Sequence, residues 1–347
     1  MAKKKKKQHY SGIGGQAVLE GVMMKNKDDY AIAVRKSNGE IDVDVEVYHS
    51  ILHGAKIKNV PFIRGIFNFI DSLRLGMRAI NHSAMFYEDE TTEANNDEKA
   101  LDKGLDKVSN GRSDKILMAL STVFAVALAV GLFIVLPLLV TRWLSKYMNN
   151  ESLLAIIEGG IRVIVFLIYI ISISLMKDIR RLYQYHGAEH KCINCIERGR
   201  ELTVGNVMRS SRIHKRCGTS FMFLVIIISV ILFFFIRIDN VFLKVLIRLA
   251  LVPVIAGISY EAIRLAGKTD NIFVKIISAP GMWLQHATTK EPDETMVEVA
   301  IKSVEAVFDW KKFLKEEFEL EFEEVEAAET PATERVGVAE DNISNES

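Results

Sequence analysis

The sequence predicts a mainly α-helical polytopic membrane protein with about four transmembrane helices and a small N-terminal β-rich cytosolic element. Apolar segments predict the helices, because each reaches roughly the 18 residues that crossing a bilayer core requires. An alternation of apolar and polar residues around one Asn-Gly pair predicts the strands. The four expected spans are residues 115–140, 153–176, 220–236 and 241–266.

The chain begins with a strongly basic segment, in which residues 3–7 are all lysine. We expect residues 1–11 to form a disordered tail. Such a tail would be either solvated or bound to anionic lipid at about 1 kcal/mol for each lysine. No apolar stretch follows the lysines, so this start does not fit a secretory signal peptide.

Residues 12–86 are expected to form a cytosolic β-hairpin followed by an amphipathic helix. The pair Asn38-Gly39 is typical of a type I′ hairpin turn. In the second strand, residues 41–47, apolar and acidic side chains alternate, and we expect the acidic face to be solvated. The helix expected over residues 61–86 combines aromatic residues and arginines. It would either lie in the membrane interface or cover the hairpin.

Composition sets the remaining boundaries. An acidic linker is expected first, and the four-helix membrane domain follows it with a central cytosolic loop. A break at Pro280-Gly281 is expected near the end of that domain, before an amphipathic helix and a disordered acidic tail. These segments are residues 87–113 (linker), 114–290 (membrane domain), 177–219 (central loop), 291–325 (helix) and 326–347 (tail).

The distribution of basic residues predicts the orientation in the membrane. Residues 177–217 contain about ten Lys and Arg against about four Asp and Glu. The positive-inside rule then places this loop and both termini in the cytosol, in a multi-pass protein of the cytoplasmic membrane, the bacterial inner membrane. Cysteines in the cytosol stay reduced, which favours thiolate metal ligands over disulfides.

The central loop contains a His-x-x-Glu-His array, formed by His186, Glu189 and His190. On a helix the two histidines lie one turn apart on one face, so both could bind the same divalent metal ion, which we expect to be zinc. This order is the inverted form of a zinc protease motif, in which the glutamate acts on the bound water. We therefore assign Glu189 as a candidate catalytic base.

Further candidate ligands lie near this array. His214 and Cys217 precede the third expected span, and Cys192 and Cys195 follow His190 closely. A hairpin of two spans would bring both groups to the same membrane surface. Because zinc takes four ligands, or three and an open position, we predict His186, His190, His214 and Cys217, with Cys195 next and Cys192 last.

Other ionisable residues could face the same site. Glu20 lies in an apolar run, and Glu261 lies toward the inner end of the last expected span, where Arg264 could pair with it. His286 could approach the same surface. Glu158 and Arg162 form an expected i,i+4 pair within the second span.

Several long motifs resemble those of a known family. They are GGQAVLEGVMMK, VPFIRGIFNFIDSL, YHGAEHKCINCIE, SRIHKRCGTSF and SYEAIRLAG. They are similar to motifs of the bacterial YqhQ-like membrane proteins, also described as domain of unknown function 1385 and as predicted metal-dependent enzymes. The resemblance implies a membrane location and a metal site at His186, Glu189, His190, His214 and Cys217. It names no substrate.

These observations favour an integral membrane, zinc-type metal-dependent enzyme at the cytosolic face, most simply a hydrolase. Its substrate would be a membrane peptide or a lipid-linked molecule, and we expect the lipid bilayer but no nucleic acid as a partner. One alternative is a non-catalytic membrane scaffold or assembly protein whose metal staples the loop. Another is a component of a transporter, which would need an oligomer because one chain has few spans.

Overall fold

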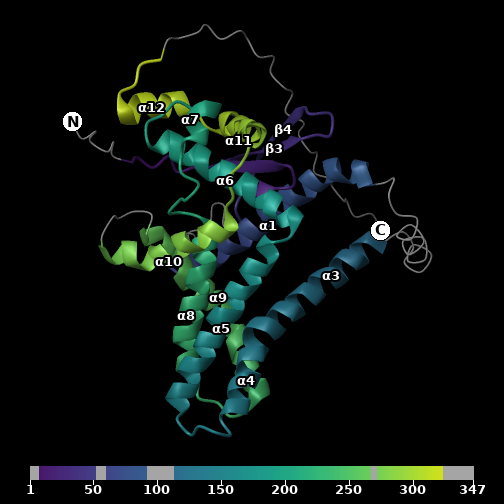
Figure 1. Cartoon of the computed structure of the whole chain (residues 1–347), viewed down its shortest axis with the longest axis vertical. Coiled ribbons are helices and arrows are strands. Elements are labelled where there is room, and N and C mark those ends of the chain that lie inside the picture. Colours follow the sequence, from purple (N-terminus) through teal and green to yellow (C-terminus); the bar gives the residue numbers. More distant parts are fainter. Residues whose placement is uncertain (1–7, 52–59, 92–112, 267–271, 323–347) are drawn as a thin grey trace, which may run out of the picture.

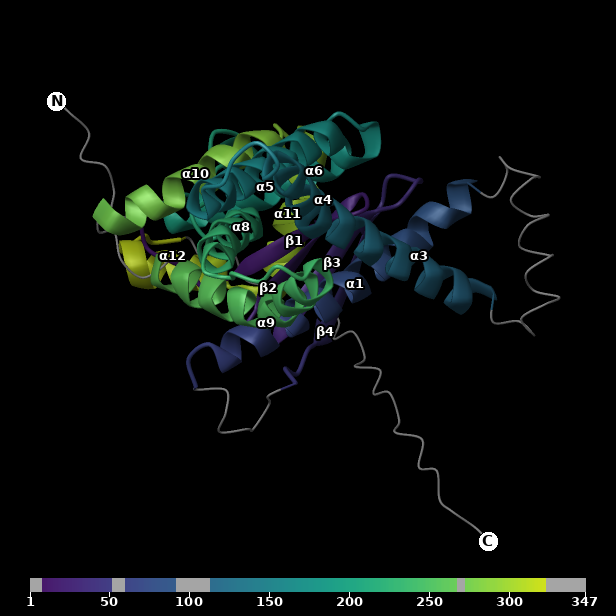
Figure 2. The same ribbon diagram turned by 90° about the horizontal axis from the view of Figure 1, so that it is seen from below.

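The computed structural model describes residues 8–51, 60–91, 113–266 and 272–322. A small sheet with helices on both faces lies at one end of the molecule, and a bundle of apolar helices extends from it (Figure 1). Seen from below, helix α3 (Ser113–Val130) leaves the bundle at an angle (Figure 2). The predicted mainly helical chain with a small N-terminal sheet is therefore confirmed.

The sheet is an antiparallel meander in the order β1-β2-β3-β4. The strands are β1 (Gly14–Val18), β2 (Gly21–Asn26), β3 (Asp29–Arg35) and β4 (Ile41–Val47). The predicted hairpin joins β3 and β4, but its turn is not type I′, because Gly39 has a positive φ and Asn38 does not. Lys36 instead accepts a hydrogen bond from Gly39 and donates one to Glu40, as in a longer loop closed by a glycine bulge.

Strand β4 faces the opposite way from our expectation. Its valines are the exposed side chains, at 38% for Val43, 53% for Val45 and 55% for Val47. Two of its acidic side chains point toward basic residues of helix α1 (Ile63–Thr91): Glu46 lies 2.6 Å from Arg78, and Asp44 lies 3.7 Å from His82. The prediction of a solvated acidic face was wrong because the pattern alone does not say which face a basic helix will cover.

Each face of the sheet is covered by helices. Helix α1 covers one face through Leu75 and Ala79, so the expected helix covers the hairpin. Helix α6 (Lys177–Glu197) and helix α11 (Glu294–Val307) cover the other (Figure 1). Helix α1 also packs closely on α9 (Val241–Ala266), since a Cβ on Gly65 would lie 3.0 Å from the Gly257 Cα.

Three helical stretches among the described residues are long and apolar enough to cross a membrane. They are Ala119–Leu144, Glu151–Ser174 (α5) and Val241–Leu265 within α9. The first runs from α3 through a π-helical segment η2 (Gly131–Val135) into α4 (Leu136–Leu144). The third expected span, residues 220–236, corresponds to α8 (Gly218–Phe234), which is apolar but shorter, with 17 residues. These helices indicate a membrane protein.

The remaining helices differ from the expected boundaries. Helix α10 (Ile272–Thr288) runs through Pro280, so the predicted break there was wrong. The expected amphipathic helix 291–325 is two helices, α11 and α12 (Trp310–Phe318), and a short helix α7 (Val204–Met208) lies in the central loop. The expected linker 87–113 includes the end of α1, while its residues 92–112 and the tail 326–347 lie outside the described residues.

Candidate metal site

Helix α6 brings His186 and His190 to one face, and their ring centroids are 4.4 Å apart. The helix packs tightly against the segment after α10, because Lys290 N donates to Tyr183 O at 2.8 Å. Gly187 makes this packing possible: a Cβ on it would collide with the backbone oxygen of Lys290. The glycine that weakens α6 in isolation is therefore the residue that lets the chain approach the histidines.

Both histidines have their Nδ1 atoms engaged by backbone carbonyl oxygens. His186 Nδ1 lies 2.9 Å from Thr288 O, and His190 Nδ1 lies 2.7 Å from Arg212 O. A carbonyl oxygen can only accept, so each Nδ1 carries a proton, and in the neutral ring it is Nε2 that has the lone pair for a metal. Metal-binding histidines in proteins are commonly oriented in this way.

Cys217 completes a group of three ligand atoms. His186 Nε2 lies 3.1 Å from Cys217 Sγ, and the ligand atoms of His186, His190 and Cys217 all lie within 4.8 Å of one another. Cys217 is the N-cap residue of α8, and its sulfur accepts a hydrogen bond from Thr219 N. The positive end of a helix dipole favours a negatively charged ligand at this position. Two imidazoles and one thiolate fit a divalent metal such as zinc.

Glu189 is buried beside this group but is not one of its three members. Its side chain is 5% exposed, and its carboxylate accepts a hydrogen bond from the Gly15 backbone of β1. The second oxygen, Oε2, is buried without a hydrogen-bond partner among the described residues. Burial raises the pKa of this carboxyl group, against the opposing effect of His186 and His214. An unpartnered buried oxygen is costly, which points to a ligand, water or substrate there.

His214 is close to the cluster but engaged elsewhere. Its Nε2 lies 3.3 Å from Glu197 Oε2, and its ring centroid is 5.7 Å from that of His190. Gln285 holds the His214 backbone by accepting from its N–H at 2.9 Å and donating to its carbonyl at 2.8 Å. The structure does not bring His214 into the three-residue group, and its role as a ligand stays a prediction.

Glu197 was not among the residues singled out from the sequence, although it lies seven residues after His190 on the same helix. It is fully buried and accepts hydrogen bonds from Gln8 Nε2 and from both N–H and hydroxyl of Ser11. Residues 8–11, expected within a disordered tail, are thus fixed to α6. Burial acts to raise the pKa of Glu197, but the hydrogen bonds from His214, Gln8 and Ser11 outweigh it and lower this pKa.

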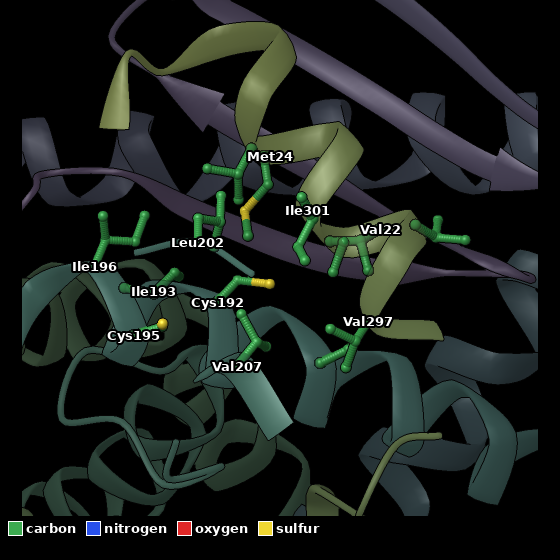
Figure 3. Packing of buried hydrophobic residues seen from close by; sticks show 14 of the residues in the cluster. Val22, Met24, Cys192, Ile193, Cys195, Ile196, Leu202, Val207, Val297 and Ile301 are labelled. Atoms are coloured by element: carbon green, nitrogen blue, oxygen red, sulfur yellow. The ribbon is translucent and has the colours of Figure 1, made fainter. Parts of the chain in front are cut away.

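The other two cysteines lie in the apolar core between α6 and the sheet. Figure 3 shows Cys192 and Cys195 among side chains that include Val22, Met24 and Ile301. Cys195 Sγ donates to Glu201 O at 3.3 Å, and burial raises the pKa of its thiol to about 11. Burial also raises the pKa of Cys192 well above its ordinary value. Neither is brought to the histidines, and thiols in such surroundings resist becoming thiolates.

The remaining candidates are placed outside the cluster. Glu20 pairs with Arg181 of α6 and accepts a hydrogen bond from the Tyr185 hydroxyl at 3.2 Å. Glu261 pairs with Arg64 of α1 at 2.6 and 2.5 Å and lies farther, at 3.9 Å, from Arg264. His286 is exposed, and its Nδ1 lies 3.0 Å from Trp283 O. Glu20 and Glu261 therefore join elements of the fold.

Comparison with known proteins extends over most of the chain. Residues 60–310 match the family described as "Protein of unknown function (DUF1385)". The chain is 36% identical over 301 residues to "Uncharacterized protein YqhQ" of Bacillus subtilis (strain 168), which covers 84% of this chain and 90% of that protein. No solved structure matches the chain.

Proposed function

The chain belongs to the DUF1385 family, and we propose that it is an integral membrane, zinc-type metal-dependent hydrolase. The family description assigns no activity, so the proposal rests on the residues of this chain. The observation that carries it is the group of His186, His190 and Cys217, with both Nδ1 atoms hydrogen-bonded to carbonyl oxygens and an unpartnered Glu189 oxygen on the same helix.

Three protein ligands are the set that catalytic zinc sites use, because they leave a fourth position for water or substrate. Zinc bound there would lower the pKa of a water molecule in the fourth position, so that hydroxide would be available to attack a substrate near neutral pH. His186 and His190 are oriented by the carbonyls of Thr288 and Arg212. Glu189 would take a proton through Oε2, the oxygen that has no partner among the described residues.

The substrate we propose is a membrane peptide or a lipid-linked molecule, handled at the cytosolic face of the cytoplasmic membrane. We include α8 as a fourth span, with both termini in the cytosol. The excess of basic residues in 177–217 and the position of Cys217 at the start of an apolar helix support this arrangement.

A metal that only staples the fold is the second candidate. It is favoured by one observation, that the cluster joins α6 to the first residue before α8 and to the end of α10. A structural metal requires the three ligands, but it does not require the unpartnered Oε2 of Glu189.

Metal analysis of the purified full-length protein tests the proposal. We expect about one zinc per chain, lost in His186→Ala and in Cys217→Ser and kept in His286→Ala, a matched change of an exposed histidine outside the cluster. Wild-type protein that takes up no divalent metal would refute both the enzyme and the staple.

Glu189→Gln separates the two candidates. This variant should keep the metal and the fold while the chemistry stops. Membranes of cells producing wild type and Glu189→Gln would be compared by mass spectrometry for peptides and lipid-linked molecules. Accumulation of an uncleaved species with the variant supports hydrolysis. If membranes from cells producing Glu189→Gln have the same peptides and lipid-linked molecules as membranes from cells producing wild type, the structural metal is favoured.

A further inference from the structure

An ionic cluster lies inside the helical bundle, near the end remote from the sheet. Glu158 of α5 lies 2.9 Å from Arg162 on the same helix and 2.5 Å from Arg248 of α9. All three side chains are buried, and both guanidinium groups lie over the ring of Phe233 of α8. The sequence analysis foresaw only the Glu158–Arg162 pair.

The cluster carries one carboxylate against two guanidinium groups. Arg162 Nε donates to Phe133 O in the π-helical segment η2 at 2.9 Å, so Arg162 is well partnered. Arg248 is 2% exposed, and its Nε has no hydrogen-bond partner among the described residues. An unbalanced positive charge and an unused N–H inside a span are costly, so an anion should accompany them.

Arg248 lines a cavity of about 460 Å³ that opens at this end of the bundle. Two further basic side chains that also line the cavity, Arg142 and Lys244, come from the end of α4 and the start of α9. The other charged lining residues are Arg237, Glu151, Glu158 and Asp239, and Arg237 lies 3.7 Å from Glu151. With Arg162 behind Glu158, positive groups outnumber negative ones around the cavity.

The cavity lies where lipid headgroups are expected. Trp143 and Tyr147, close to Arg142 in the sequence, are 58% and 71% exposed, and their rings are in contact at 5.4 Å between centroids. Exposed Trp and Tyr at the ends of apolar helices mark the membrane–water interface. The common anion at that depth is phosphate, which guanidinium and ammonium groups bind well.

We propose that the cavity between the ends of α4, α5, α8 and α9 binds a phosphate group through Arg248, Lys244 and Arg142. The phosphate belongs to an anionic phospholipid or is free inorganic phosphate. This site is independent of the metal cluster, which lies at the opposite end of the bundle.

Thermal unfolding of the full-length protein in detergent tests the proposal. Wild type is titrated with dioleoylphosphatidylglycerol, with dioleoylphosphatidylcholine and, separately, with inorganic phosphate against chloride at equal ionic strength. Lys244→Gln removes a half-buried cation from the cavity wall, and Lys146→Gln removes an exposed lysine that does not line it. Arg248→Gln removes the unbalanced buried charge.

We expect phosphatidylglycerol to raise the unfolding temperature and phosphatidylcholine to act much more weakly. Lys244→Gln should weaken the apparent affinity about fivefold, Lys146→Gln should leave it unchanged, and Arg248→Gln should abolish the effect. Stabilisation by phosphatidylglycerol alone identifies the lipid headgroup as the source. Stabilisation by inorganic phosphate that Lys244→Gln weakens identifies free phosphate.

Two results would overturn the proposal. One is that neither the anionic lipid nor phosphate stabilises the wild type. The other is that Lys244→Gln and Lys146→Gln respond to them as the wild type does. If Arg248→Gln does not fold, the comparison of Lys244→Gln with Lys146→Gln still tests the proposal, because neither lysine belongs to the buried ionic cluster of Glu158, Arg162 and Arg248.

Discussion

Replacing Gly187 with alanine tests the packing that orients the candidate metal ligands. In an ordinary helix interior this change stabilises by about 1 kcal/mol. Here the new methyl group would collide with the backbone oxygen of Lys290 and meet Pro292 Cδ at 3.4 Å. The Lys290 oxygen cannot move aside as a flexible side chain could, because this segment of backbone is held by the hydrogen bond from Lys290 N to Tyr183 O.

Overpacking of this kind costs about 1–3 kcal/mol, and contact with fixed backbone places Gly187→Ala near the upper end. Subtracting the gain in helix propensity leaves a net loss of about 2 kcal/mol, or about 4 °C in unfolding temperature for a chain of this size. Moving residues 288–290 also moves Thr288 O away from His186 Nδ1. We therefore expect zinc affinity to fall about tenfold.

Thermal unfolding in detergent and competition with a zinc-binding dye measure the two effects. Gly205→Ala is the control, because Gly205 is an exposed glycine of α7 whose added Cβ would meet only the end of Arg209, at 3.5 Å. It should be neutral or slightly stabilising. If Gly187→Ala unfolds at or above the wild-type temperature with unchanged zinc affinity, the close approach described above is refuted.

Three further predictions concern other buried contacts. Cys192→Ala should keep the metal and lower the free energy of unfolding by about 1 kcal/mol, because the thiol fills space in the apolar core. If this variant lost as much metal as Cys217→Ser, the prediction would be contradicted. Because the pKa of Glu197 is lowered in the folded protein, its ionised carboxylate stabilises the fold fully above about pH 4.5, and this stabilisation is lost as the pH falls through the folded-state pKa. Unfolding of the metal-free protein in acid should show this loss. Identical pH profiles of stability for wild type and Glu197→Gln would exclude it. Gly65→Leu should push α1 away from the backbone of α9 and lower the unfolding temperature. Gly131→Leu should not lower it, because nothing lies within 4 Å of the position of a Cβ on Gly131. Equal unfolding temperatures for the two variants would contradict the close contact between α1 and α9.

The fold class was predictable from the sequence because it depends on length and periodicity. Apolar stretches predicted the spanning helices, alternation predicted strand β4, and the Asn38-Gly39 turn predicted β3 as its partner. The orientation of β4 was not predictable, because the pattern Ile41 to Val47 fits either face. Arg78 and His82 of α1 fix this orientation by pairing with Glu46 and Asp44, and no local rule links these two residues to β4.

The candidate site was predictable to the same extent. His186 and His190 could be paired because helical spacing is a local property. Cys217 lies 27 residues after His190. It could be placed near the histidines because the apolar segments on either side of the central loop predicted that α8 starts at the membrane surface where α5 ends. The engagement of His214 by Glu197 and Gln285 could not be foreseen, because buried hydrogen bonds between distant segments leave no pattern in the sequence.

The carbonyl groups that orient the two histidines also set an order of events during synthesis. Thr288 lies 102 residues after His186, and α8 and α9 lie between them. At about 5–20 residues per second, the ribosome needs on the order of 5–20 s to reach Thr288 after making His186. For that interval His186 has no carbonyl to fix its tautomer, so the cluster is complete only after α8, α9 and α10 have been made. Nascent chains that stop before Thr288 would carry the His-x-x-Glu-His array but could not hold His186 in place.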